Sequence, residues 1–168
     1  SIYSYETNTF TTFEEHELSR LWPQLEKATR LIGYNSEHFD LPILNKYYAG
    51  DLLHFPQLDL LKVIKESTGR RFKLDDIAQA TIQTKKGADG LQAIKWWEEG
   101  RKEEVKKYCE LDVKITRDLY EYGKKNKMLY YPTLTGEIQP FPVNFDMPAS
   151  AHTSTDPVPR SVNLTLPF

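Results

Sequence analysis

The 168-residue chain is poor in residues that crosslink a protein or anchor it in a membrane. Its single cysteine, Cys109, excludes an internal disulfide and a structural zinc site built from several thiolates. No apolar run approaches the roughly 20 residues needed to cross a bilayer, and the first residues, Ser1 to Glu6, hold neither a basic nor an apolar leader segment. These absences favour one soluble domain in a reducing, cytoplasmic compartment.

Net charge is also small, at −2, which argues against a protein that coats nucleic acid along its length. The charges are unevenly placed, however. Residues 1–61 carry four Lys/Arg and nine Asp/Glu, whereas residues 62–127 carry seventeen and twelve. A positive region beside an acidic one suits a nuclease whose carboxylates hold cations while basic residues hold phosphates, and it equally suits an ordinary charged helix surface.

The first 45 residues predict strands that alternate with helices. Tyr3 and Tyr5 alternate with polar residues before a turn at Thr7-Asn8, which predicts a β-hairpin. Thr12 and Glu15 have the spacing of a capping box, and the helical pattern after them runs to about Lys27, across Pro23. A further strand and a further helix are expected from the segments that follow, Leu31-Ile32-Gly33-Tyr34-Asn35 and Asp40-Leu41-Pro42. The order implies an α/β layered fold.

Residues 58–128 are expected to be mostly helical, and the last helix is expected to be the longest. One stripe of this helix should face the interior, made of Val105, Tyr108, Asp112, Ile115, Leu119 and Tyr122. After Pro132 the chain becomes rich in Pro, Thr and Ser. Residues 1–145 are therefore predicted to form the folded domain, and residues 146–168 a flexible tail or linker.

Asp112 is anomalous, because a carboxylate inside an apolar helical stripe must be paired, hydrogen-bonded or bound to a cation. Tyr108 lies four residues earlier, so its phenol projects from the same face one turn away. The alternative is a structural role, in which Asp112 is a buried acid that accepts a hydrogen bond from Tyr108 or from the backbone. A second acid, Asp40, follows the strand ending near Asn35, at the edge where α/β sheets bind ligands. Its alternative role is that of a helix N-cap.

Two motifs together carry a family resemblance. Asn35 with Phe39-Asp40 has the form Asn-x-x-x-Phe-Asp, and Tyr108 with Asp112 has the form Tyr-x-x-x-Asp. They resemble the second and third motifs of the DEDD exonucleases, which are named after four acidic residues. The segments similar to the YprB-type branch of the ribonuclease H-like superfamily are Ile32-Gly33-Tyr34-Asn35, Phe39-Asp40-Leu41-Pro42-Ile43-Leu44 and Tyr108-Cys109-Glu110-Leu111-Asp112-Val113. The resemblance covers about residues 1–130. The histidine branch has its His where this chain has Lys107, so the chain is similar to the tyrosine branch, DEDDy.

The resemblance implies a ribonuclease H-like mixed sheet flanked by helices and a 3′→5′ exonuclease that hydrolyses phosphodiester bonds of single-stranded DNA or RNA. Asp40 and Asp112 would help to hold two Mg²⁺ or Mn²⁺ ions, for which oxygen ligands are suited. Tyr108 would orient the attacking water. Candidate nucleic-acid contacts are Asn35, His38 and Phe39 of the second motif and the basic residues Arg70, Arg71 and Lys73. Such basic runs also occur as solvated loops.

The family's first motif, Asp-x-Glu on the first strand, is missing. Tyr5-Glu6-Thr7 resembles its end, but Ser4 stands where the Asp is required. We therefore expect a domain that lacks its N-terminal strand or strands and two of its four carboxylates, and that is inactive as this chain alone. The rival hypothesis is a catalytically dead nucleic-acid-binding or scaffolding domain of a helicase- or polymerase-associated protein. A third is an unrelated helical protein in which Asp40 and Asp112 lie far apart.

Overall fold

The computed structural model describes residues 1–84 and 90–146, and its mixed α/β architecture confirms the predicted fold class. The expected tail, 146–168, lies outside the described residues except for Asp146. The elements in chain order are β1 (Ile2–Ser4), β2 (Thr9–Thr11), η1 (Glu15–Glu17), α1 (Leu18–Lys27), β3 (Leu31–Gly33), α2 (Asp40–Leu44), η2 (Leu52–His54), β4 (Gln57–Asp59), α3 (Leu60–Thr68), α4 (Leu74–Ile82), α5 (Gly90–Glu98), α6 (Lys102–Asn126), β5 (Met128–Pro132) and β6 (Ile138–Pro142).

The strands pair two by two. β1 and β2 form the predicted antiparallel hairpin, and Asn8 in its turn adopts the left-handed conformation that asparagine tolerates, with φ 55°. β3 and β4 pair in parallel, with Gly33 opposite Asp59, so both strands end at the same edge. β5 and β6 form a second antiparallel hairpin. Within the described residues these are three separate two-stranded sheets, whereas one mixed sheet was expected.

Three of these strands were not predicted. β4 lies at the start of the region expected to be helical, because Leu58 and Asp59 run directly into the apolar pattern of α3. β5 ends at Pro132 and β6 lies in the proline-rich segment after it, and prolines normally argue against a strand. They are compatible with this hairpin because each of its strands has only one neighbour in the sheet.

The start of α1 differs from the predicted capping box. The box is formed two residues later, between Glu14 and Glu17, and it caps the 3₁₀ turn η1, which precedes the helix. Thr12, the predicted cap, instead donates a hydrogen bond to Glu110 on α6 (3.1 Å). The helix ends at Lys27 as predicted and contains Pro23 near its middle.

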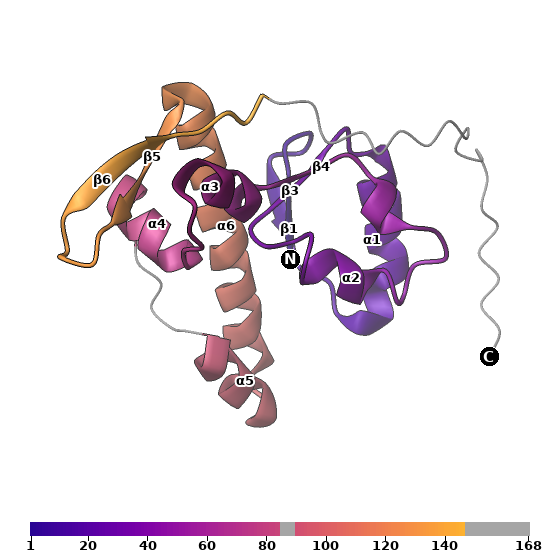
Figure 1. Ribbon diagram of the computed structural model, residues 1–168. Helices are drawn as coiled ribbons and strands as arrows, with labels where there is room; N and C mark the ends of the chain where they lie inside the picture. The colour runs from indigo at the N-terminus through magenta and orange to yellow at the C-terminus, as the bar shows by residue number, and fades with distance from the viewer. Residues whose placement is uncertain (85–89, 147–168) are drawn as a thin grey trace.

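Two hydrophobic cores flank the β3–β4 pair. One gathers α3, α4, α6 and the β5–β6 hairpin, and the other gathers α1, α2 and η2. Figure 1 shows α6 near the middle of the molecule, with α4 and β5–β6 on one side of it and α1 and α2 on the other. β3 joins the two cores, because Leu31 packs against the α1 core while Ile32 packs against the α6 core.

Helix α6 is the longest of the described helices and carries the predicted stripe in part. Ile115 and Leu119 are completely buried, whereas Tyr108 and Asp112 are only half-buried. The stripe is therefore core in its second half and partly accessible in its first. None of the described helices is apolar enough over a sufficient length to cross a membrane.

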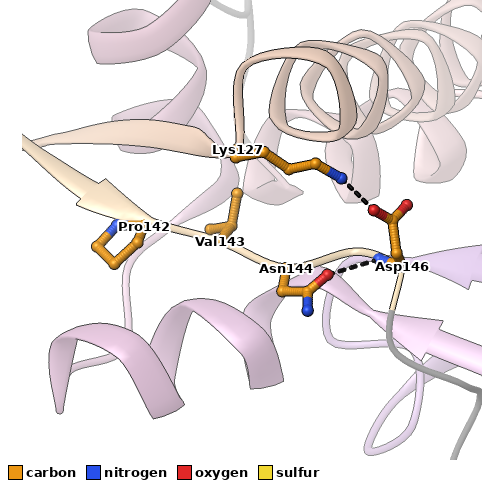
Figure 2. A pocket seen from close by; sticks show the side chains of 5 residues that line it. All are labelled: Lys127, Pro142, Val143, Asn144 and Asp146. Carbon is orange, nitrogen blue, oxygen red and sulfur yellow. Dashed lines mark hydrogen bonds and ion pairs between the residues drawn. The ribbon is translucent and has the colours of Figure 1, made fainter.

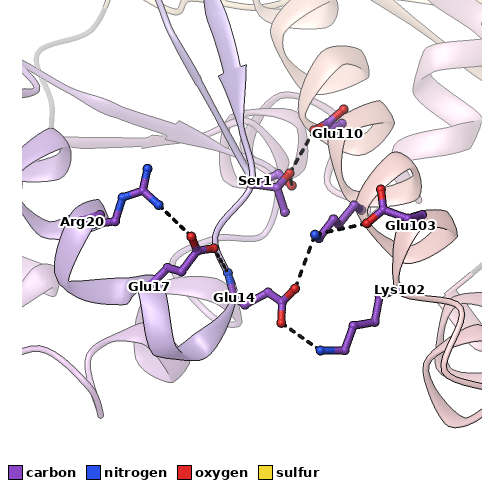
Figure 3. Close-up of polar contacts among 9 residues, drawn as sticks. Ser1, Glu14, Glu17, Arg20, Lys102, Glu103 and Glu110 are labelled. Atoms are coloured by element: carbon purple, nitrogen blue, oxygen red, sulfur yellow. Dashed lines mark hydrogen bonds and ion pairs between the residues drawn. The ribbon is translucent and has the colours of Figure 1, made fainter.

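Polar contacts tie the N-terminal region to the first turns of α6. Glu14 pairs with Lys102 (2.9 Å), as Figure 3 shows, and with Lys106 (3.4 Å). These side-chain hydrogen bonds lower the pKa of the Glu14 carboxyl. Because the pairs are exposed, they orient the hairpin and α1 against α6 more than they stabilise the fold.

Candidate active site

The candidate site begins where β3 and β4 end. Asp59, the last residue of β4, is 4 % exposed, and its carboxylate accepts hydrogen bonds from three backbone N–H groups: Leu61 (2.9 Å), Asn35 (2.8 Å) and Glu37 (3.1 Å). The first of these caps α3. The other two fix the loop that leaves β3, in which Asn35 has a left-handed φ of 63°. Asp59 thus holds the backbone of the second motif in place.

Asp40 is the first residue of α2 and is exposed. The N-cap position belongs to Phe39, which makes no side-chain cap bond, so the predicted capping role of Asp40 is wrong by one residue. The helix is started by backbone bonds of the preceding loop, from Phe39 N to Asn35 O and from Leu41 N to Ser36 O. Helix capping therefore does not account for this carboxylate.

The electrostatics of Asp40 place it near two other acids. Although the residue as a whole is exposed, partial burial of its carboxyl group raises the pKa of Asp40, and the negative charges of Asp59 and Asp112 raise it further. Its own backbone N–H and the amino group of Ser1 lower the pKa. Residues from α2, β4 and α6 thus bring carboxylates within electrostatic range of one another, although 72 positions separate Asp40 from Asp112.

Asp112 and Tyr108 lie on α6, the helix that contacts β3. The Oδ1 atom of Asp112 is shielded from solvent although the residue as a whole is half-buried. Tyr108 lies one helical turn before it and is likewise half-buried. A partly accessible acid with a phenol on the same helix face is what the third motif requires.

The loop between α3 and α4 supplies positive charge beside the acids. Arg71 donates a hydrogen bond to the Asn35 side chain (2.8 Å), which connects the basic residues to the second motif. Arg70 stacks over Phe72 at 5.4 Å, and Tyr34 donates to the Phe72 carbonyl (2.9 Å). Burial, followed by the charges of Asp76 and Asp59, raises the pKa of Tyr34, so its hydroxyl remains a donor.

The remaining predicted contacts are dispersed around this centre. His38, Phe39 and Lys73 are exposed, and Lys73 is the N-cap residue of α4. Asp59 is a further residue of this region that was not singled out from the sequence, since residues 58–128 were expected to be mostly helical. Its position at the end of a strand paired with β3 was the missing information, because β4 was not recognised.

The hollow shown in Figure 2 is separate from these residues. It has a volume of about 560 Å³ and is lined by Lys127, Pro142, Val143, Asn144 and Asp146. An ion pair between Lys127 and Asp146 crosses its rim. None of the sequence-predicted site residues lines it.

The site offers the oxygen donors that Mg²⁺ and Mn²⁺ prefer, but it offers too few of them. Asp40 and Asp112 offer carboxylate oxygens, whereas the Asp59 carboxylate is occupied by three N–H donors. Across residues 1–84 and 90–146, no group of three or more His, Cys, Asp or Glu side chains is arranged to hold a metal ion. The described donors therefore do not fit a two-metal centre.

Comparison with known families gives one match. A sequence model described as the RNase H superfamily matches residues 1–123. The matched range includes Asp40, Asp59, Tyr108 and Asp112 and ends within α6, before the β5–β6 hairpin. No curated protein matches, and no solved structure matches. The match contradicts the hypothesis of an unrelated helical protein.

Proposed function

This chain belongs to the RNase H superfamily, and we propose that it derives from a 3′→5′ exonuclease of the tyrosine (DEDDy, YprB-type) branch that acts on single-stranded DNA or RNA. The observation that carries the proposal is geometric: β3 and β4 end side by side, and Asp59 at the end of β4 binds the loop that leads from β3 to Asp40. Burial of its carboxyl group, and then the charges of Asp59 and Asp112, raise the pKa of Asp40 at this edge, and such perturbed acids are candidate functional groups.

Each group has a place in this chemistry. In a complete site of this kind, Asp40 and Asp112 would help to hold a hard cation, Mg²⁺ or Mn²⁺, which would supply the positive charge that polarises a phosphodiester. Tyr108 would orient a water molecule beside them. Arg70, Arg71 and Lys73 lie on the exposed loop beside Asn35 and bind the phosphates of the strand.

The incomplete donor set leads us to propose that this chain alone binds a strand without cleaving it. Two carboxylates among the described residues do not make the clamp that steadies both the entering and the leaving oxygen. The same observation favours the second candidate function, a nucleic-acid-binding or scaffolding domain that works beside a helicase or polymerase. Both candidates share the binding step and differ in whether hydrolysis follows.

A 5′-labelled single strand incubated with this chain and Mn²⁺ separates the two parts of the proposal. We expect no shortening of the strand, and we expect binding, measured by fluorescence anisotropy, that weakens in Arg71→Ala. Lys27→Ala, an equally simple charge removal on the exposed side of α1, serves as the control and should bind normally.

Two results would contradict the proposal. Mn²⁺-dependent shortening that disappears in Asp112→Ala would show that the chain is active alone. Binding that is equally weakened by Arg71→Ala and Lys27→Ala would show that the basic loop has no special role in holding the strand.

A further inference from the structure

One side of helix α2 is buried in the core that it shares with α1, and the other side is exposed. Leu41 is buried, and Leu44 and Tyr48 pack with it in the α1 core. On the opposite side Phe39, Ile43 and Tyr47 are 60 %, 43 % and 48 % exposed. We call these three residues the α2 stripe. Exposed large apolar side chains at four-residue steps form one continuous surface rather than isolated exceptions.

The stripe is ordered by the backbone as far as its last residue. Beyond α2, Lys46 N bonds to Ile43 O (3.2 Å) and Tyr47 N bonds to Leu44 O (3.0 Å), so hydrogen-bonded turns of the 3₁₀ type continue to Tyr47. The stripe therefore runs from the N-cap of α2 to the turns that follow the helix. It begins at Phe39, directly before Asp40, and therefore leads away from the acidic site.

Two cations lie at this segment beside its acids, of which Asp40 belongs to the candidate site and Glu37 is paired with Lys62 (3.1 Å). Lys46 is exposed within the stripe, and Arg71 is bound to Asn35, four residues before Phe39. Aromatic rings beside cations are the combination with which proteins bind unpaired strands, because every base has a face that can stack and every phosphate a charge to neutralise. Bases in a duplex are already stacked and offer no free face.

We propose that the α2 stripe is a stacking surface for the unpaired bases of a single strand, with Tyr47 as a contact remote from the acids. This inference rests on the proposed function and deepens it: it names the surface that holds the bases of the single strand, whether DNA or RNA. A protein occupant is less suited to the surface, since three side chains are few beside the roughly 20–30 residues a side of a standard interface.

The test is binding of a dye-labelled 12-nucleotide single strand in EDTA, followed by anisotropy. Tyr47→Ala should weaken binding at least about fivefold, at the low end of what one stacked base contributes. Tyr47→Trp should restore it. Tyr5→Ala removes an equally exposed tyrosine (53 %) from the β1–β2 hairpin and should change nothing. A strand of the same length with abasic sites should bind Tyr47→Ala and the unaltered chain alike.

The outcomes distinguish the two proposals. If Arg71→Ala weakens binding while Tyr47→Ala does not, the stripe is overturned and the proposed function stands. If the unaltered chain binds no strand, both are overturned. If duplex of the same length binds as well as the single strand, the stacking role is overturned. If Tyr47→Ala instead abolishes concentration-dependent self-association in sedimentation, the stripe is a protein interface and the inference is wrong.

Discussion

Replacing Asp59 should loosen the candidate site and destabilise the fold together. Its carboxylate accepts three backbone hydrogen bonds at a position that is only 4 % exposed. Asp59→Ala removes all three acceptors, whereas Asp59→Asn keeps Oδ1 for Asn35 and Leu61 and turns an amide donor towards the Glu37 N–H. The first substitution frees the loop and uncaps α3, and the second affects mainly the loop.

The expected magnitudes follow from how well water can replace each bond. Leu61 is buried, so its N–H stays unsatisfied, whereas Asn35 and Glu37 are half-buried and can be rehydrated in part. A hydrogen bond to a charged group contributes about 1.5–3 kcal/mol. We expect Asp59→Ala to lower the free energy of unfolding by about 3–5 kcal/mol, and Asp59→Asn by about 1–3 kcal/mol.

Urea unfolding followed by circular dichroism measures both values. Asp51 is a matched control, because its side chain also caps a helical turn through one backbone N–H, that of Leu53 (2.9 Å), but at an exposed position. Asp51→Ala should cost no more than about 1 kcal/mol. Equal losses for Asp59→Ala and Asp51→Ala would refute the reasoning, since burial and the number of acceptors would then not matter.

Three further predictions concern packing and charge. Although alanine favours helices, Gly123→Ala should lower the free energy of unfolding by about 1–3 kcal/mol, measured as a lower melting temperature, because its Cβ would overlap the ring of Phe145; Phe145→Leu should relieve part of the loss. Asp112→Asn should lower the pKa of Asp40 in a carbon-detected NMR titration, since one of the charges raising it is removed; an unchanged pKa would contradict their proximity. A raised pKa means that the folded chain binds the Asp40 proton more tightly than the unfolded chain does. The stabilisation that results is complete below the unfolded-state pKa of about 3.9 and is lost as pH rises through the folded-state pKa. Glu14→Gln should cost little stability at high salt and more at low salt and neutral pH, with the difference vanishing as pH falls through the lowered pKa of Glu14.

The sequence predicted those elements that have strong local signals. The β1–β2 hairpin follows from alternation and an Asn turn, and α6 follows from a long helical period that ends where Lys127 adopts a left-handed conformation. Asp112 could be singled out because a carboxylate is conspicuous among apolar residues. Each of these signals lies within a short stretch of the sequence, where local backbone preferences determine the structure.

Features that depend on tertiary contacts were missed. β4 is three residues long and is a strand only because β3 lies beside it. The β5–β6 hairpin contains prolines, yet Phe141, Val143 and Phe145 in and after it are buried in the core. The role of Asp59 depends on a loop 24 residues earlier in the chain, and no local pattern reports such a distance.

Paramagnetic broadening by Mn²⁺ in amide NMR spectra tests most directly whether Asp40 and Asp112 form one acidic site. The account predicts weak binding that broadens the signals around both residues, at 35–40 and at 108–112, and that is lost in both segments when either carboxylate is replaced by its amide. Broadening of one segment without the other, or of neither, would contradict it.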